Sequence, residues 1–232
     1  MMSVNFMIPF AGGSSVSFSR WETSCLDEFV FIDAPGKGRN RKTPMLRSMR
    51  DVAAFCADFI EKYLEEHECD EYCLCGHSMG SYLVYEVVKA FSIHGKRMPR
   101  CIVLSGTVAP NKMKKETIRN AMVDDNSFMK HLKEFGLLNS DIMESRFFRR
   151  QYLPMIKGDY QMLLEYETDV VKISNVEVYV INGLDDDSLS EESVTEWSSY
   201  FGEPPKYIWV AGDHFFLLNN SRIIQDVIGI QC

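Results

Sequence analysis

The sequence predicts an α/β fold in which a mostly parallel sheet is flanked by helices. Short apolar runs rich in β-branched and aromatic residues recur along the chain, and stretches with helical periodicity separate them. The runs are apolar enough to be covered on both faces, as strands of parallel sheets are. A chain of 232 residues, 46% of them hydrophobic, can bury one substantial core, so we expect one domain over residues 1–232.

Six apolar runs are the predicted strands, at residues 4–8, 29–32, 72–75, 101–104, 176–181 and 207–210. Helical periodicity predicts helices at about 48–66, 80–94, 191–200 and 221–228. The second of these carries apolar residues at helical spacing and stops at Gly95, a residue type that commonly ends helices. Residues 107–168 show helical patterns throughout and no convincing strand, so we expect an inserted helical lid there.

Charge and composition exclude several classes of function. A formal net charge of -8 argues against nucleic acid as a partner, because phosphate binding needs a concentrated basic surface. We expect neither a secretory signal nor a membrane span, since no basic segment precedes the first apolar run and no apolar run is long enough to cross a bilayer. Seven cysteines form an odd set without paired spacing, which favours a reducing compartment and hence the cytoplasm.

The strongest chemical signal is Gly-His-Ser-Met-Gly at 76–80, a G-x-S-x-G pentapeptide. It follows a predicted strand and opens a predicted helix, and this context distinguishes it from a chance glycine-rich turn. A serine on a sharp strand-to-helix turn holds its Oγ outward, as in enzymes of the α/β-hydrolase fold. Ser78 is therefore the predicted nucleophile.

A serine hydroxyl needs a base within hydrogen-bond reach. His67 ends an acidic helix, and His77 stands on the turn itself and points away. His94 ends the helix behind the serine, and His131 lies in the predicted lid. His214 follows the last predicted strand and so lies at the carboxyl edge of the sheet, where open α/β sheets assemble their sites. His214 is the predicted base.

The third member of such a triad is a carboxylate that orients the imidazole, and in this fold it lies between the serine and the histidine in the sequence. Three adjacent aspartates, at 185–187, lie in the loop that directly follows the predicted strand at 176–181. Any one of them can also be a solvated turn residue or a helix cap. We predict Asp186 as the acid, with Asp185 as the alternative.

Attack on a carbonyl also requires two donors for the oxyanion. The backbone N–H of Met79, the residue after the serine, is the first, and the glycine-rich turn after the first strand offers that of Ala11. We expect no metal or diffusible cofactor. Sequence neighbours at His67, Cys69, Cys73 and Cys75 could suggest zinc, but they straddle a loop and a buried strand, so we interpret them as small core residues.

Five segments in order resemble the type II thioesterases that accompany nonribosomal peptide and polyketide synthases. They are Pro-Phe-Ala-Gly-Gly at 9–13, Ala-Pro-Gly-Lys-Gly-Arg at 34–39, the pentapeptide at 76–80, Asn-Gly-Leu-Asp-Asp at 182–186 and Gly-Asp-His-Phe-Phe-Leu at 212–217. The combination of the early Ala-Gly-Gly turn with the Gly-Asp-His-Phe-Phe ending is more specific than the pentapeptide alone. Lys37 departs from the arginine or histidine that the family commonly has, and the N-terminus is short.

The resemblance implies an α/β-hydrolase core with a helical lid, and hydrolysis of acyl groups from the phosphopantetheine thiol of acyl or peptidyl carrier proteins. Phosphopantetheine enters as part of the substrate. Carried over by motif, the nucleophile is Ser78, the base His214, the acid Asp186, and the oxyanion donors Met79 and Ala11. We expect a monomer that removes misloaded or stalled acyl units.

Other functions fit the same motifs. A medium-chain fatty acyl thioesterase, a carboxylesterase and an acyltransferase can all use this triad, because fold and triad do not choose the acyl acceptor. A catalytically silent module that only binds carrier proteins is an alternative of another class, against which the intact serine, histidine and acidic loop weigh.

Two segments suggest how substrates are recognised. Residues 37–50 carry six basic residues and no acidic one, so they could attract an acidic carrier protein, although an ordinary solvated loop explains them equally well. The predicted lid is rich in side chains that can repack around different acyl chains. These are Met113, Met122, Met129, Met143, Met155 and Met162 together with Phe128, Phe135, Phe147 and Phe148.

Overall fold

The computed structural model describes residues 3–21, 29–138, 142 and 144–229. Six parallel strands form one sheet in the order β2-β1-β3-β4-β5-β6. They are β1 (Ser3–Ile8), β2 (Phe29–Phe31), β3 (Glu71–His77), β4 (Cys101–Ser105), β5 (Glu177–Gly183) and β6 (Lys206–Val210). All six predicted strands are present with ends within two residues of the prediction, which confirms the mostly parallel α/β fold.

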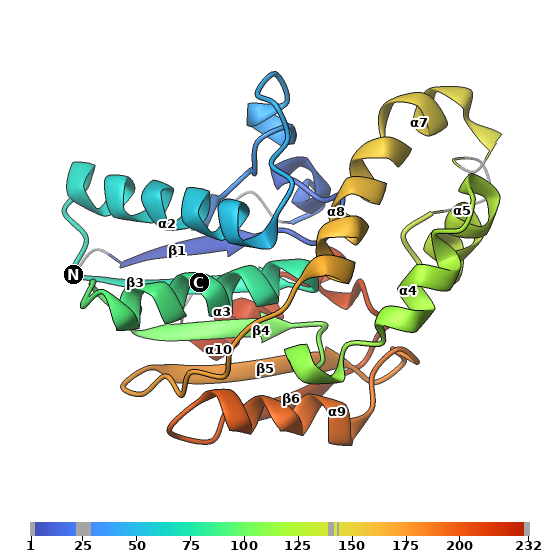
Figure 1. Cartoon of the computed structure of the whole chain (residues 1–232). Helices are drawn as coiled ribbons and strands as arrows, with labels where there is room; N and C mark the ends of the chain where they lie inside the picture. The colour runs from blue at the N-terminus through green and yellow to red at the C-terminus, as the bar shows by residue number, and fades with distance from the viewer. Residues whose placement is uncertain (1–2, 22–28, 139–141, 143, 230–232) are drawn as a thin grey trace.

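Helices cover both faces of this sheet (Figure 1). On one face lie α2 (Met49–Glu66), α3 (Met79–Ile93) and α9 (Glu191–Thr195), and on the other lies α10 (Arg222–Ile228). Short 3₁₀ turns, η1 (Ser15–Phe18), η2 (Gly38–Asn40), η3 (Pro110–Lys112) and η5 (Phe216–Asn219), lie in the loops. No helix in the described part of the chain combines the length and apolarity that a membrane crossing requires.

The two core layers follow from the alternation of side chains along the strands. In β3, Tyr72 and Leu74 pack in the layer under α2 and α3, whereas Cys73 and Cys75 pack in the opposite layer. Cys69 packs in the layer under α2 and α3, away from Cys73 and Cys75, and the ring of His67 stacks on Tyr63. Among the residues described, no group of three or more His, Cys, Asp or Glu side chains could hold a metal ion.

One predicted helix differs in kind from the prediction. Residues 191–200 are α-helical only as far as Thr195 and continue as the 3₁₀ helix η4 (Glu196–Tyr200). A 3₁₀ helix has three residues per turn, so side chains three apart lie on one face. Trp197 and Tyr200 have this spacing, and both are buried against α3. The tighter turn therefore lets two large aromatic rings enter the core together.

Between β4 and β5 the described chain contains four α-helices, which stand at the arrowhead end of the strands in Figure 1. They are α4 (Lys115–Ala121), α5 (Asp125–Glu134), α7 (Arg146–Gln151) and α8 (Leu153–Glu165). We call residues 107–168 the helical insertion. The helical insertion lies over the carboxyl ends of the strands, and the loops that follow the strands converge there (Figure 1).

The chain enters the sheet at β1, adds β2 on one side, and then crosses to place β3 on the other side. A reversal of this kind opens a crevice at the carboxyl ends of the two adjacent strands, and ligands of open α/β sheets bind there. The loops after β1 and β3 carry residues 9–13 and Ser78. Topology alone thus brings the predicted nucleophile and the predicted oxyanion turn together.

Candidate active site

Ser78 lies on a strained turn between β3 and α3. Its φ of 53° and ψ of -117° lie in a region that residues other than glycine rarely adopt. The Ser78 N–H donates a 2.7 Å hydrogen bond to the carbonyl of Ser105 and so ties the turn to β4. A Cβ on Gly80 would lie 2.1 Å from the carbonyl oxygen of Ile8, so only glycine lets α3 approach β1 this closely. The strand-turn-helix context predicted for the pentapeptide is present.

This strain predicts that two variants of Ser78 differ in their free energy of unfolding. Ser78→Gly should have a free energy of unfolding about 1 kcal/mol above that of Ser78→Ala, because relief of a strained φ outweighs the added flexibility of glycine in the unfolded chain. Urea denaturation of both variants measures the difference. Equal midpoints and equal slopes would show that the turn stores no strain.

His214 and Asp186 form a buried hydrogen-bonded pair. The imidazole Nδ1–H donates to Asp186 Oδ2 at 2.6 Å, and only 4% of His214 and 8% of Asp186 are exposed. The backbone N–H and the Oγ of Ser188 both donate to the other carboxylate oxygen, at 3.0 and 2.5 Å. Burial alone raises the pKa of Asp186, but the hydrogen bonds from His214 and Ser188 outweigh it and hold the pKa below its ordinary value. The carboxylate is therefore charged and fixed in orientation.

The three adjacent aspartates differ in their contacts. Asp185 accepts a 3.2 Å hydrogen bond from the backbone N–H of Gly212, which pins the loop after β5 to the loop after β6. Asp187 lines the cavity described below. Of these three side chains, Asp186 is the one with a hydrogen bond to the imidazole, so it remains the candidate acid.

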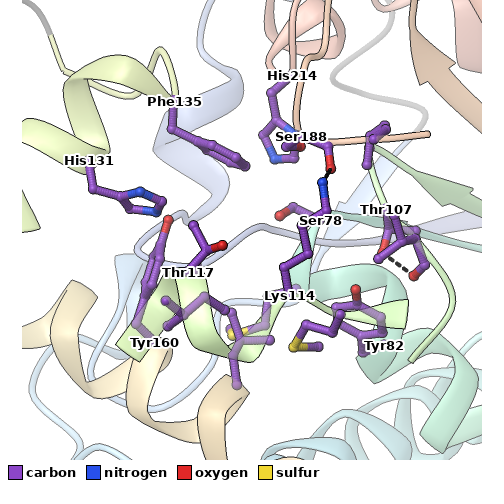
Figure 2. Close-up of a pocket in the computed structure, with 18 of the residues that line it drawn as sticks. Ser78, Tyr82, Thr107, Lys114, Thr117, His131, Phe135, Tyr160, Ser188 and His214 are labelled. Atoms are coloured by element: carbon purple, nitrogen blue, oxygen red, sulfur yellow. Dashed lines mark hydrogen bonds between the residues drawn. The ribbon is translucent and has the colours of Figure 1, made fainter. Parts of the chain in front are cut away.

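Ser78 and His214 line one cavity of about 320 Å³, shown in Figure 2. His214 Nε2, the nitrogen turned from Asp186, is buried and has no hydrogen-bond partner within the described ranges. A buried polar atom without a partner costs about 1–3 kcal/mol, so such an atom in a native site calls for a functional explanation. The structure brings the serine and the imidazole to the same cavity, although no hydrogen bond joins them in this state; such bonds often tighten only when substrate binds.

Both predicted oxyanion donors belong to residues that line this cavity. Met79 is the first residue of α3, where the helix leaves backbone N–H groups without an intrahelical acceptor. Ala11 lies in a tight turn closed by a 2.8 Å hydrogen bond from the Gly13 N–H to the carbonyl of Phe10. Their backbones come from neighbouring strands, because β1 and β3 pair in register up to Ile8 and Gly76.

His77 is the first residue whose place the sequence did not predict. Its ring was expected to point away from the site, but it is fully buried and lies 5.3 Å from the ring of His214. A 3.0 Å hydrogen bond joins its Nδ1 to the hydroxyl of Ser105. Burial, with a smaller effect of His214, lowers the pKa of His77 well below its usual value, so the ring is neutral at pH 7. A neutral ring at this place adds no positive charge beside the imidazole of His214.

Phe135 is the second residue whose place the sequence did not predict. It follows α5, and the centre of its ring lies 4.1 Å from that of His214 (Figure 2). His131 and Tyr160 form another part of the cavity wall, with ring centres 5.8 Å apart. The sequence placed both aromatic and histidine side chains in the insertion, but nothing in it could show which of them contacts the loop after β6.

Only some of the methionines and phenylalanines of the helical insertion line the cavity. Of the methionines and phenylalanines named above, Met113 and Phe135 line the cavity. Phe128, Met129 and Met162 are buried in the core instead. Met143 lies outside the described residues. The rest of the wall is mostly apolar and includes Tyr82, Val108, Ile118, Leu163 and Leu189.

Comparison with known proteins agrees with this geometry. The chain is 22% identical over 228 residues to the probable anguibactin biosynthesis thioesterase AngT of Vibrio anguillarum, covering 96% of this chain and 88% of that protein. It is 22% identical to the human medium-chain S-acyl fatty acid synthase thioesterase, with 97% and 84% coverage.

Among solved structures, the chain matches YbtT, the type II thioesterase from the yersiniabactin NRPS/PKS biosynthetic pathway, with a TM-score of 0.83, 25% identity and coverage of 98% and 91%. The family model described as "Thioesterase domain" matches residues 6–230. The chain belongs to the thioesterase domain family and is a hydrolase that acts on thioesters.

Proposed function

We propose that this chain removes acyl groups from the phosphopantetheine thiol of carrier proteins, with Ser78 as nucleophile, His214 as base and Asp186 as the orienting acid. The observation that carries the assignment is the buried His214–Asp186 hydrogen bond, which leaves Nε2 unpaired beside the cavity that Ser78 lines. The relatives named above belong to anguibactin biosynthesis, the yersiniabactin NRPS/PKS pathway and fatty acid synthesis, and they support a carrier-bound substrate.

In the proposed acylation, the Ser78 hydroxyl proton moves to His214 Nε2 while Oγ attacks the thioester carbonyl carbon. The carbonyl oxygen becomes an oxyanion, which the backbone N–H groups of Met79 and Ala11 stabilise. The tetrahedral intermediate then expels the pantetheine sulfur, which takes the proton from His214. The product is an acyl ester on Ser78 and a free carrier thiol.

Deacylation repeats these steps with water. His214 accepts a proton from water as the oxygen attacks the acyl ester, and it returns that proton to Ser78 Oγ when the carboxylic acid leaves. The charged carboxylate of Asp186 favours the imidazolium in both halves. No residue of this scheme requires a metal ion or a diffusible cofactor.

Hydrolysis of acetyl-loaded carrier protein is the direct test, with reaction of Ser78 with a fluorophosphonate as a second readout. The proposed function predicts turnover of the carrier thioester and labelling of Ser78. A protein that is folded, unlabelled and inactive would be a silent carrier-binding module. A protein that is labelled but cleaves oxygen esters in preference to thioesters would be a carboxylesterase on the same scaffold.

We further propose that the carrier docks on the exposed basic side chains of Arg39, Arg41 and Lys42. All three border a surface groove beside η1 and η2. Arg41 and Lys42 also border a second groove, which extends to Gly12, the neighbour of Ala11 in the cavity wall. Phe147 of α7, which is 67% exposed, lies on the same groove. Basic and apolar side chains beside the cavity suit an acidic protein that carries its substrate on a long arm.

Replacing Arg39, Arg41 and Lys42 together by glutamate should raise KM for acyl-carrier protein about tenfold or more, because reversed charges repel an acidic partner. The kcat/KM for a small acyl-pantetheine thioester should stay within about twofold, since the cavity is untouched. Steady-state kinetics on both substrates at low salt checks this expectation.

A matched control replaces Lys62, Lys96 and Lys206 by glutamate, which changes the net charge equally but near the opposite edge of the sheet. It should leave both substrates nearly unaffected. If the first variant lost kcat/KM equally on carrier-bound and small substrates, the docking role would be refuted.

The cavity wall also predicts control of chain length by the insertion. Met113→Trp should shrink the cavity and lower the ratio of octanoyl to acetyl hydrolysis by about tenfold or more, the lower end of what one poorly accommodated methylene costs. Met122→Trp is the control, because Met122 is not part of the described cavity wall. Using a ratio measured on one variant cancels general effects on folding. An unchanged ratio would show that acyl chains lie elsewhere.

The same profile decides between two thioesterase roles. The human relative is a medium-chain thioesterase, and an apolar wall suits such chains. Preference for acetyl and other short units on carrier protein supports the editing role. Strong preference for medium-length chains supports the fatty acyl role.

A further inference from the structure

We propose that Asp159 is a positioning residue that fixes the oxyanion turn, residues 10–13, from the helical insertion, with Lys37 as its counterion. The inference rests on the proposed function, because the turn matters only if Ala11 donates to the oxyanion. It concerns a carboxylate outside the catalytic triad and a part of the chain more than a hundred residues away from the turn.

Two hydrogen bonds converge on one oxygen of Asp159, which lies on α8 and is 0% exposed. Its Oδ2 accepts a 2.5 Å hydrogen bond from the backbone N–H of Gly12. The same oxygen accepts a hydrogen bond from Nζ of Lys37, which is 5% exposed and lies in the loop after β2. One buried carboxylate therefore joins the turn after β1, the loop after β2 and the insertion.

Packing around Gly12 shows that α8 sits directly on the turn. Gly12 has a φ of +78°, which favours glycine, and a Cβ at this position would lie 2.6 Å from Cγ1 of Ile156. Ile156 precedes Asp159 by three residues and so lies on the same face of α8. The Gly12 N–H is thus held by the carboxylate while the Cα is held by the helix, and Ala11 is the residue immediately before it.

The charges around the turn explain why the carboxylate has a buried partner. A lone carboxylate beside the turn would oppose the negative charge that develops on the substrate oxygen, and it would be costly to bury. Lys37 neutralises it at the same oxygen that binds Gly12. Lysine stands at the position where the resemblance leads one to expect arginine or histidine, and its single ammonium reaches a carboxylate that has no water-exposed surface.

Pairs of uncharged variants separate positioning from simple packing. Lys37→Met with Asp159→Asn and Lys37→Met with Asp159→Leu both remove the buried charges, and only the first keeps an oxygen that can accept from the Gly12 N–H. Replacing a buried ion pair by uncharged groups of similar size is usually tolerated. The two double variants therefore differ chiefly in the acceptor.

The variant with leucine should have a kcat about tenfold or more below that of the variant with asparagine, with KM values within about twofold, because a displaced oxyanion donor acts in the transition state. Its affinity for a trifluoromethyl ketone, whose adduct with Ser78 places an oxyanion in the same site, should fall in parallel. Equal kcat values and equal inhibitor affinities in the two folded variants would overturn the proposal.

Urea midpoints of both variants report folding, and Lys37→Met with Asp159→Ala serves if leucine cannot be accommodated. The kcat values of the two double variants can also be compared on p-nitrophenyl acetate. This test therefore remains possible even if the wild-type protein does not hydrolyse thioesters. Wild-type protein with no reactivity at Ser78 would overturn the proposed function and this inference together.

Discussion

Ser78→Ala should lower kcat for thioester hydrolysis on the order of 10⁶-fold, the loss seen when a triad hydrolase is deprived of its nucleophile. The physical reason is that the variant lacks the hydroxyl that the proposed mechanism has His214 activate, so the covalent route is lost. The variant should fold like the wild-type protein, since alanine keeps the Cβ and the strained φ of 53°. Single-turnover hydrolysis of acetyl-carrier protein measures the effect.

The control for this experiment is Ser105→Ala. Ser105 also lies beside the site, but its hydroxyl contacts His77 and its carbonyl, which remains in the variant, accepts from the Ser78 N–H. It should lose far less activity than the Ser78 variant. Residual turnover by Ser78→Ala above a hundredth of the wild-type rate would mean that another group carries the acyl chain.

Asp186→Asn should lower kcat by about 10⁴-fold while leaving the structure of the site intact. An asparagine amide would donate to His214 Nδ1 and so place the ring proton on Nε2, the nitrogen that must accept from Ser78. The amide also carries no charge to stabilise the imidazolium. Steady-state kinetics on a small acyl thioester gives the number without any contribution from carrier docking.

Asp185→Asn is the matched control, because its side chain contacts the Gly212 N–H and not the imidazole. It should reduce kcat no more than a few-fold. If the two asparagine variants lost activity equally, the charged pair with His214 would not be the source of the effect.

The strands of the sheet could be predicted from the sequence, and candidate triad residues could be selected from it, because both depend on local pattern. A buried parallel strand is an apolar run, and a nucleophile turn needs glycines at fixed offsets, whatever the rest of the chain does. Asp186 could only be preferred over its neighbours, since the choice depends on Ser188 and His214 reaching the same carboxylate.

Contacts between distant segments could not be predicted. The ring of Phe135 lies against His214, the ring of His77 lies beside it, and Gly12 is hydrogen-bonded to Asp159; each contact joins segments between 79 and 147 residues apart. Lys37 illustrates the difficulty: it was grouped with the exposed basic residues that follow it, but it is buried and paired with Asp159. Hydrophobic pattern does not reveal a buried ion pair, because a lysine in a basic loop has the signature of a solvated residue.

The most direct test of the assembled site is a crystal structure of the protein after reaction with an alkyl fluorophosphonate. The account predicts phosphorus bonded to Ser78 Oγ, one phosphonate oxygen about 3 Å from the backbone nitrogens of both Met79 and Ala11, and His214 Nε2 facing the adduct with Nδ1 still on Asp186. An adduct on another residue, or on Ser78 with the imidazole of His214 turned away and no backbone donor near the oxygen, would contradict it.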